Sequence, residues 1–302
     1  MSSLTNWTFN SLVPSGFPAT VLPNVEFWNV SNGINPEYQI QVSWPLEWAS
    51  RDVESTALTM YVLDGNVLGA TATEAIRRRK PVEPSQPDSI IVSIGYPLTD
   101  TVYIPQRSID FQPPIYEGSK PPESPDPLPK SGADDFIQFI DTVLRPWVHS
   151  TLFPKVNFAR DALYGHSFGG LFVIHTLITQ PELFDTFHSA SPALFWNGGY
   201  MLEQLGRLED VPIKGTKPAL TIGYGSLEQF PVQRRTETDE AFKERRDLIR
   251  TFKIKDNCKM LYKRLKKSEK LRAVELKEYK GQDHAGAGAS ALMDGYEFFI
   301  DW

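Results

Sequence analysis

Apolar and polar residues follow one another in patterns that predict strands in the first half of the chain. Residues Tyr38 to Trp44 alternate between apolar and polar side chains, as in a strand that buries one face. Residues 56–63 and 89–94 are almost continuously apolar, which is typical of strands in a parallel sheet covered on both faces. Helices are predicted at 67–79, which ends in basic side chains, and at 133–144, where apolar residues recur at helical spacing.

The second half of the chain continues this succession of strands and helices. Further strands are predicted near 162–164, 184–190, 219–223 and 273–279, and further helices at 168–179 and 289–300. Because the elements alternate without an internal repeat or a clear linker, we predict a single α/β domain over residues 36–302. Its central sheet is expected to be mostly parallel, with helices on both faces.

Three stretches depart from this pattern. Residues 1–35 hold proline, asparagine and isolated aromatic residues without periodicity, and we predict an irregular N-terminal arm. Residues 112–129 form a Pro-rich insertion, in which proline disfavours both helix and ladder. Since long irregular connections in compact domains are commonly functional, we expect this insertion beside the active site. The highly charged stretch 234–272 predicts one or two exposed helices.

Composition narrows the class of protein. The 302 residues are 41% hydrophobic, enough for a large core, and a net charge of −6 disfavours a nucleic-acid partner. Cys258 is the single cysteine, so no intrachain disulfide can form. No stretch approaches the roughly 20 apolar residues of a membrane span. The first residues also lack the basic start and apolar run of a signal peptide, so we expect a cytoplasmic protein.

Residues 165–169, Gly165-His166-Ser167-Phe168-Gly169, match G-x-S-x-G between a predicted strand and a predicted helix. This is the nucleophile elbow of the α/β-hydrolase fold, in which a strained turn presents the serine at a helix N-terminus. The glycines are needed because a Cβ at either position would meet neighbouring backbone. We therefore predict an α/β-hydrolase fold with Ser167 as nucleophile.

A serine nucleophile needs a histidine base, which follows the serine in the chain order of this fold. Of the five histidines, His284 alone follows the last predicted strand, where catalytic groups of open parallel sheets gather. The others precede the serine or lie within predicted elements: His149, His166, His175 and His188. We predict His284 as the base, against the alternative of a surface-loop histidine.

The acid that orients the base is expected in the loop after the strand ending at Gly223. Glu228 lies in that loop and is the predicted acid, although another group could orient His284. Asp283 is too close in sequence to reach back easily, and is expected to face solvent or form a turn. The oxyanion is expected to be held by the backbone N–H groups of Phe168 and Tyr96.

Several stretches then resemble a known family. They are YVLDGN (61–66), IGYP (94–97), RSIDF (107–111), GHSFGG (165–170), SASPALFW (189–196) and GQDH (281–284). In this order they resemble the esterase branch of the α/β-hydrolases, especially the siderophore esterases related to enterobactin esterase. The resemblance spans about residues 35–300, and the overall pattern is similar to fungal cytosolic enzymes that hydrolyse triacetylfusarinine C or fusarinine C.

The resemblance implies a function and a site. It implies a serine esterase that cuts the ester bonds of a hydroxamate siderophore, so that iron is released inside the cell. It also implies Ser167 and His284 as the catalytic pair and Tyr96 in the oxyanion hole. Arg107, Asp110 and Trp196 are implied near the substrate. No cofactor or metal site is expected, because any iron would arrive within the substrate.

Other functions remain open from the sequence. A general carboxylesterase, or a thioesterase of the formylglutathione hydrolase type, would use the same triad. An acyltransferase would pass the same acyl-enzyme to an acceptor other than water. A catalytically silent α/β-hydrolase that serves as a binding protein is disfavoured because both Ser167 and His284 are present. The oligomeric state is not predicted.

Overall fold

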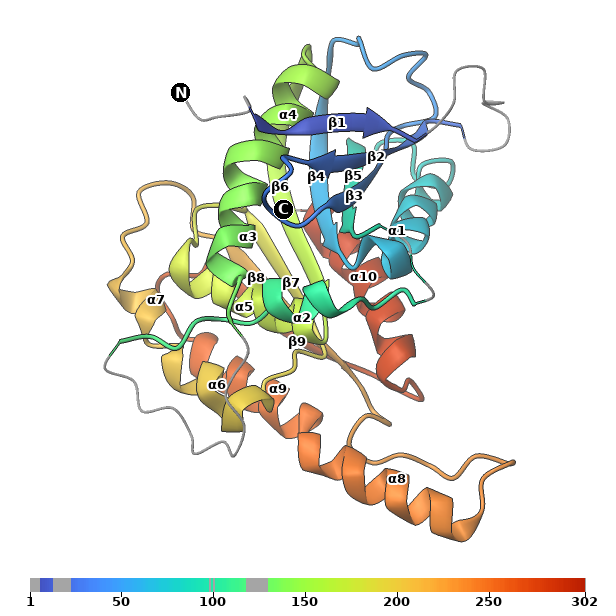
Figure 1. The fold of residues 1–302 in the computed structure, drawn as a ribbon, viewed down its shortest axis with the longest axis vertical. Coiled ribbons are helices and arrows are strands. Elements are labelled where there is room, and N and C mark those ends of the chain that lie inside the picture. The colour runs from blue at the N-terminus through green and yellow to red at the C-terminus, as the bar shows by residue number, and fades with distance from the viewer. Residues whose placement is uncertain (1–5, 13–22, 98, 100, 118–129, 302) are drawn as a thin grey trace. The chain divides into compact units, whose positions relative to one another are not determined.

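A computed structural model describes residues 6–12, 23–97, 99, 101–117 and 130–301. The chain divides into two compact units. Figure 1 shows the ribbon with its helices and strands labelled. The first unit comprises Met1–Phe111, Ser131–Leu163 and Tyr296–Trp302, and the second comprises Gln112–Lys130 and Tyr164–Gly295. Strand β6 (Val156–His166) and helix α10 (His284–Ile300) each contain residues of both units.

The strands of the first unit pair in both directions. They are β1 (Thr8–Ser11), β2 (Val25–Ser31), β3 (Tyr38–Ser43), β4 (Ser55–Leu63) and β5 (Asp88–Gly95). Strand β2 pairs antiparallel with both β1 and β3, and β3 pairs antiparallel with β5. Strand β4 is parallel to β5, in agreement with their continuously apolar sequences.

Helices cover both faces of these strands. They are α1 (Gly65–Arg79), the short α2 (Pro105–Asp110) and a continuous helical stretch made of α3 (Ala133–Phe139), a π-helical turn (Ile140–Leu144), α4 (Arg145–Trp147) and a second π-helical turn (Val148–Leu152). On β3, Gln41 Nε2 donates to Thr73 Oγ1 of α1 (2.9 Å), whereas the Tyr38 ring stacks on Phe139 of α3, with centroids 4.4 Å apart. Because side chains alternate along a strand, α1 and α3 lie on opposite faces.

The second unit contains a parallel group of strands. They are β7 (Thr186–Ala190), β8 (Ala219–Gly225) and β9 (Ala273–Tyr279), each parallel to the next. Helices α5 (Phe168–Thr179) and α10 lie on opposite faces of β7. Ser189 Oγ donates to Gly170 O of α5 (2.9 Å). The adjacent His188 faces α10, because a Cβ on Gly295 would lie only 2.9 Å from His188 Nδ1.

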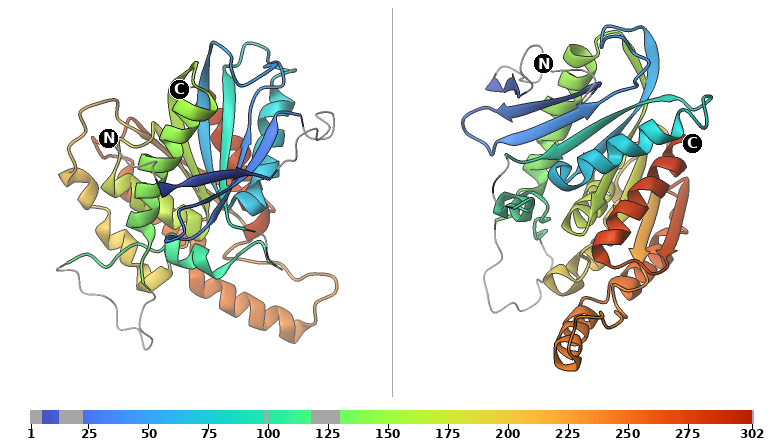
Figure 2. Two further views of the ribbon diagram at one scale, coloured as in Figure 1. Left: turned by 45° about the horizontal axis from the view of Figure 1, so that its top comes forward. Right: turned by 90° about the vertical axis from the view of Figure 1, so that its right-hand side faces the viewer.

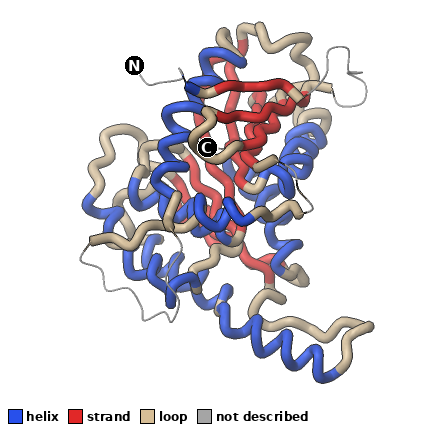
Figure 3. The backbone as a smooth tube through the Cα atoms, viewed as in Figure 1, coloured by secondary structure: helices blue, strands red, loops and turns tan. Residues whose placement is uncertain are grey.

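The remaining helices of the second unit follow β7 and β8. They are a 3₁₀ turn (Trp196–Gly199), α6 (Tyr200–Gln204), α7 (Arg207–Asp210), α8 (Asp239–Phe252) and α9 (Ile254–Leu265). Helix α9 packs against β8 and β9 and buries Cys258 completely. Helix α8, by contrast, has no buried residue and extends away from β7, β8 and β9 (Figures 1, 2 and 3).

Most predicted elements are present, and the N-terminal arm is corrected. The prediction of irregular structure over residues 1–35 is wrong for Thr8–Ser11 and Val25–Ser31, which form β1 and β2. Within the second of these, Val25, Trp28 and Val30 are buried. Residues 118–129 of the predicted Pro-rich insertion lie outside the described residues. The single domain over residues 36–302 stays a prediction.

Among the described parts of the chain, no helix combines the length and apolar character that a membrane crossing requires.

Candidate active site

Ser167 occupies a sharp turn between β6 and α5, as the sequence predicts. Strand β6 ends at His166 and α5 begins at Phe168, and Ser167 itself has φ 60° and ψ −117°. A positive φ is costly for a residue with a side chain and persists only where the surroundings impose it. A Cβ on Gly165 would lie only 2.3 Å from Gly169 O, so this glycine is sterically required. The predicted strand–turn–helix geometry is confirmed.

Backbone hydrogen bonds hold this turn against the end of β7 and the loop that follows it. Ser167 N donates to Ala190 O (2.9 Å), and Ala193 N donates to Ser167 O (3.0 Å). The turn is therefore fixed on both sides of the serine by one neighbouring segment. Because Phe168 is the first residue of a 12-residue helix, its N–H group lies at the positive end of the helix dipole.

His284 and Glu228 lie in direct contact. The Nδ1 of His284 is 2.5 Å from Oε2 of Glu228, which is the distance of a short hydrogen bond to a carboxylate. The Glu228 side chain is 1% exposed, whereas that of His284 is 47% exposed. A buried carboxylate thus holds one nitrogen of the ring and leaves the other edge accessible.

The loops that carry these two side chains are joined through their backbones. Ser226 N donates to Tyr279 O (2.9 Å), and Leu227 N donates to Gln282 O (3.0 Å). A Cβ on Gly225 would lie 2.3 Å from Gln282 O, so the loops approach each other too closely for any other residue there. Asp283 is exposed, which agrees with the expectation that it faces solvent, and its Oδ1 caps the start of α10 by accepting from Gly286 N (3.1 Å).

The residue before Ser167 also touches the histidine. The rings of His166 and His284 have centroids 4.3 Å apart and are tilted by 42°. A Cβ on Gly288 would lie 3.0 Å from the His166 ring, so the small residues after His284 make room for His166. The elbow and the start of α10 are thereby packed together within the second unit.

Three other predicted site residues lie in the first unit. Arg107 forms a two-point ion pair with Asp64, through Nε to Oδ1 and Nη2 to Oδ2 (2.9 Å). Asp110 accepts from Tyr96 Oη (2.9 Å) and from Gln106 Nε2 (2.7 Å), and its burial raises its pKa to about 6. Arg107 and Asp110 are thus each held by partners within the protein, and their contact with substrate stays a prediction.

The backbone of Tyr96 has a partner that the sequence did not indicate. Tyr96 N donates to Asn66 Oδ1 (2.7 Å), and Asn66 Nδ2 donates to Tyr96 O (2.8 Å). The N–H group predicted for the oxyanion hole is therefore engaged by an amide side chain. A Cβ on Gly95 would lie 2.3 Å from Asn66 Oδ1, so the preceding glycine is needed for this pairing.

Trp196 lies in the second unit, directly after the Ser191–Phe195 turn. It is 9% exposed and packs edge-on against the Tyr200 ring, with centroids 6.2 Å apart. Its predicted contact with substrate stays a prediction. Among the described residues, no group of three His, Cys, Asp or Glu side chains is arranged to hold a metal ion.

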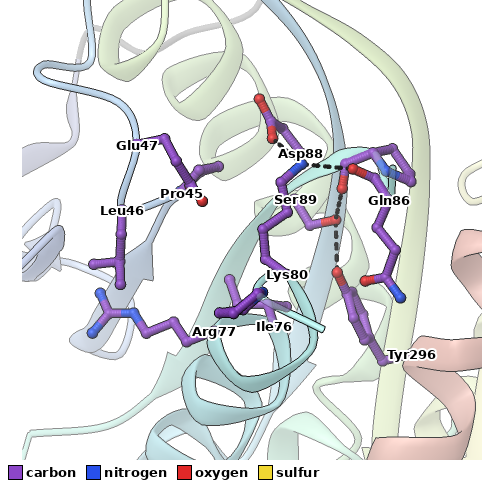
Figure 4. A pocket seen from close by; sticks show the side chains of 12 residues that line it. Pro45, Leu46, Glu47, Ile76, Arg77, Lys80, Gln86, Asp88, Ser89 and Tyr296 are labelled. Atoms are coloured by element: carbon purple, nitrogen blue, oxygen red, sulfur yellow. Dashed lines mark hydrogen bonds and ion pairs between the residues drawn. The ribbon is translucent and has the colours of Figure 1, made fainter. Parts of the chain in front are cut away.

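A cavity in the first unit lies away from the predicted oxyanion donor. It is lined by residues at the amino end of β5 and by α1, α10 and the loop after β3, among them Ser89, Lys80 and Tyr296 (Figure 4). Tyr296 Oη donates to Ser89 Oγ (3.0 Å) at its wall. Tyr96 follows the carboxyl end of the same strand, roughly 25 Å further along. The cavity is therefore not part of the predicted site.

The comparisons with known proteins agree with this geometry. A family model for esterases, described as "Putative esterase", matches residues 31–251. The chain belongs to this esterase family. The resemblance inferred from the sequence motifs is thereby confirmed.

Two curated relatives of this esterase cover nearly its whole length. A siderophore enterobactin esterase of Emericella nidulans is 40% identical over 98% of both chains. A siderophore triacetylfusarinine C esterase of Aspergillus fumigatus is 35% identical over 93% of this chain and 95% of the relative.

Solved structures show the same fold. The siderophore hydrolase EstA from Aspergillus nidulans superposes with a TM-score of 0.87 at 39% identity, covering 96% of this chain and 98% of EstA. The predicted α/β-hydrolase fold of this esterase is confirmed.

Proposed function

We propose that this esterase hydrolyses the ester bonds of a siderophore, with a hydroxamate siderophore of the triacetylfusarinine C type as substrate. The observation that carries the proposal is the buried Glu228 carboxylate held on His284 in the same unit as the strained Ser167 turn. The two curated relatives, which are siderophore esterases by name, support the substrate class.

The proposed reaction begins at the histidine. Because Nδ1–H of His284 donates to Glu228, Nε2 is the basic nitrogen and takes the proton from Ser167 Oγ. The serine oxygen then attacks the ester carbonyl carbon. The negative charge that develops on the carbonyl oxygen is stabilised by Phe168 N–H at the start of α5.

His284 next returns the proton to the leaving alcohol, which yields an acyl-Ser167 intermediate. A water molecule then attacks the acyl carbon, His284 takes its proton, and Ser167 leaves as the free hydroxyl. Tyr96 N–H is proposed as the second oxyanion donor, and it can act only when its bond to Asn66 Oδ1 opens. The iron is part of the substrate and is not held by the protein.

We also propose a cytoplasmic location, which suits an enzyme that opens an imported ferric complex. Fractionation of cells that express the tagged full chain would test this location. Recovery of the chain outside the cytoplasmic fraction would contradict it.

The deciding experiment follows hydrolysis of ferric triacetylfusarinine C by chromatography. Wild type should release hydroxamate monomers, and Ser167→Ala should lose this activity by at least a thousandfold, because the nucleophile is gone. The matched control is Ser150→Ala, an exposed serine whose Oγ bonds Pro146 O. That variant should keep wild-type activity.

Other substrates separate the alternatives. Cleavage of ferric enterobactin alone would keep the siderophore function and change the substrate. Turnover of p-nitrophenyl butyrate without either siderophore would leave a general esterase, and preference for small thioesters would favour the thioesterase function. Activity that survives Ser167→Ala would overturn the proposed mechanism.

A further inference from the structure

Ser191 is a buried residue with a strained backbone that the sequence did not single out for a role. It follows β7 directly, is 0% exposed, and has φ 42°. Described non-glycine residues with positive φ include two serines, Ser167 and Ser191. Asparagine and aspartate tolerate this conformation better than serine does, so Ser191 is held there by its surroundings.

The surroundings are the neighbouring strand and the Glu228 carboxylate. Ser191 N donates to Gly223 O (2.7 Å), which continues the pairing of β7 with β8 by one residue. With the backbone fixed in this way, Ser191 Oγ donates to Glu228 Oε1 at 2.6 Å. The strained conformation therefore aims the hydroxyl at the carboxylate.

Glu228 consequently receives donors on both oxygens. Oε1 accepts from Ser191 Oγ and from Gly225 N, and Oε2 faces His284 Nδ1. A buried carboxylate is strongly destabilised when a donor is removed, because water cannot replace it. Two donors on Oε1 also fix the rotation of the carboxylate, which directs Oε2 to the histidine.

We propose that Ser191 is a positioning residue for catalysis, which acts by holding the ionised Glu228 carboxylate in the orientation that serves His284. The inference rests on the proposed function. The Ser191 hydroxyl donates to Glu228 and acts through that carboxylate, so its loss should lower kcat and leave KM unchanged.

Two substitutions separate the hydroxyl from the backbone strain. Ser191→Ala and Ser191→Gly both remove the hydroxyl, but only glycine relieves the positive φ. Hydrolysis of p-nitrophenyl butyrate should fall in kcat by about 10- to 100-fold in both variants, as expected for a lost bond to a charged group. The melting temperature should be higher for Ser191→Gly than for Ser191→Ala.

The pH profile supplies a readout that a merely structural residue would not change. Without the Ser191 donor the carboxylate is free to rotate away from Nδ1 and stabilises the imidazolium of His284 less, so the acid limb of kcat should move to lower pH. Titratable groups near this pair include Cys258 of α9, which faces the Glu228 charge, His166, which packs on His284, and Asp283, which adjoins His284 in the chain. All three are the same in wild type and variants.

Ser189→Ala is the matched control. Ser189 is also buried on β7, but its Oγ donates to Gly170 O of α5. This variant should lower the melting temperature without moving the acid limb. If both Ser191 variants keep kcat within twofold of wild type, or if kcat simply follows melting temperature, the inference is wrong. Loss of p-nitrophenyl butyrate hydrolysis in Ser167→Ala, measured alongside, shows that the serine mechanism stands, and cleavage of ferric triacetylfusarinine C by wild type tests the proposed function separately.

Discussion

Glu228 shows how several segments of the chain fix one side chain. Its carboxylate receives donors from Ser191 after β7, from Gly225 at the end of β8 and from His284 at the start of α10. Only the last of these partners was predicted. The hydrogen bond between a buried acid and an exposed histidine is the arrangement that sets a tautomer, because the acid accepts from one ring nitrogen only.

Glu228→Gln should lower kcat for p-nitrophenyl butyrate by at least a hundredfold. The amide keeps the shape but removes the negative charge that stabilises imidazolium as His284 takes the serine proton. The matched control is Glu237→Gln, which breaks an ion pair with Arg245. Wild-type kcat in Glu228→Gln would show that another group orients His284, and Asp283 would be the next candidate to substitute.

His188 is a second buried residue, and its protonation affects the stability of the folded chain. Its ring is fully buried on β7, Nδ1 lies 2.8 Å from Thr221 Oγ1, and burial lowers its pKa to about 3. The unfolded chain takes up this proton near pH 6.5, and the folded chain does not. The stability that this residue contributes is therefore present above pH 6.5 and is lost as the pH falls towards 3.

The His188→Asn variant tests this sign. The wild-type free energy of unfolding, measured with urea, should fall relative to that of the variant by up to about 1.4 kcal/mol per pH unit below pH 6.5. Asp110, whose raised pKa makes stability fall as the pH rises from 4 to 6, is common to both chains and cancels in the difference. A difference that stays flat between pH 7 and 4.5 would contradict the prediction.

At the scale of elements, α8 is stabilised mainly by its own sequence. None of its 14 residues is buried, and Thr238 caps it by accepting from Ala241 N (3.2 Å). Asp239 and Glu240 in its first turn and Arg250 in its last turn suit the helix dipole. Since an isolated helix of this length is marginal in water, its end groups should decide its local stability.

Thr238→Ala should make the amides of α8 exchange with deuterium about fivefold faster, because losing a cap costs about 1 kcal/mol. The melting temperature should hardly change, since α8 contributes no buried residue to the core. Thr251→Ala serves as the control, because Thr251 lies in the last turn of the same helix and alanine is the better helix former there. Equal exchange in Thr238→Ala and wild type would refute the role of the cap.

Local patterns explain what the sequence could predict. The elbow is encoded by Gly165, Ser167 and the apolar residues around them, so its strand, turn and helix were predictable. Glu228 and His284 follow strands and could be proposed from chain order alone. The strands at Thr8–Ser11 and Val25–Ser31 were missed because their stability comes from pairing, β1 with β2 and β2 with β3, which is not visible in their own residues.

Contacts between distant residues explain what was missed. Nothing near Ser191 in the sequence indicates that β7 would bring it to Glu228, 37 residues away. In the same way, Asn66 Oδ1 accepts from the N–H group of Tyr96, which lies 30 residues further along the chain. Both hydrogen bonds depend on the register of adjacent strands, and a one-residue shift in register would abolish both.

At the scale of the whole molecule, the division into two units separates the predicted residues. Ser167, Phe168, Glu228, His284 and Trp196 belong to the second unit, and Tyr96, Arg107 and Asp110 belong to the first. The acid–base pair is therefore complete within one unit. The predicted second oxyanion donor, Tyr96, and two of the three predicted substrate contacts, Arg107 and Asp110, belong to the first unit.

The burial of Cys258 has a consequence for the chemistry of the folded chain. Burial, together with the nearby Glu228 charge, raises the pKa of this thiol well above its usual range. Thiolate is the reactive form, and here it is both scarce and out of reach of solvent. The folded esterase should thus be indifferent to the redox state of its surroundings, and alkylation of its single thiol would count the molecules whose α9 has come away from β8 and β9.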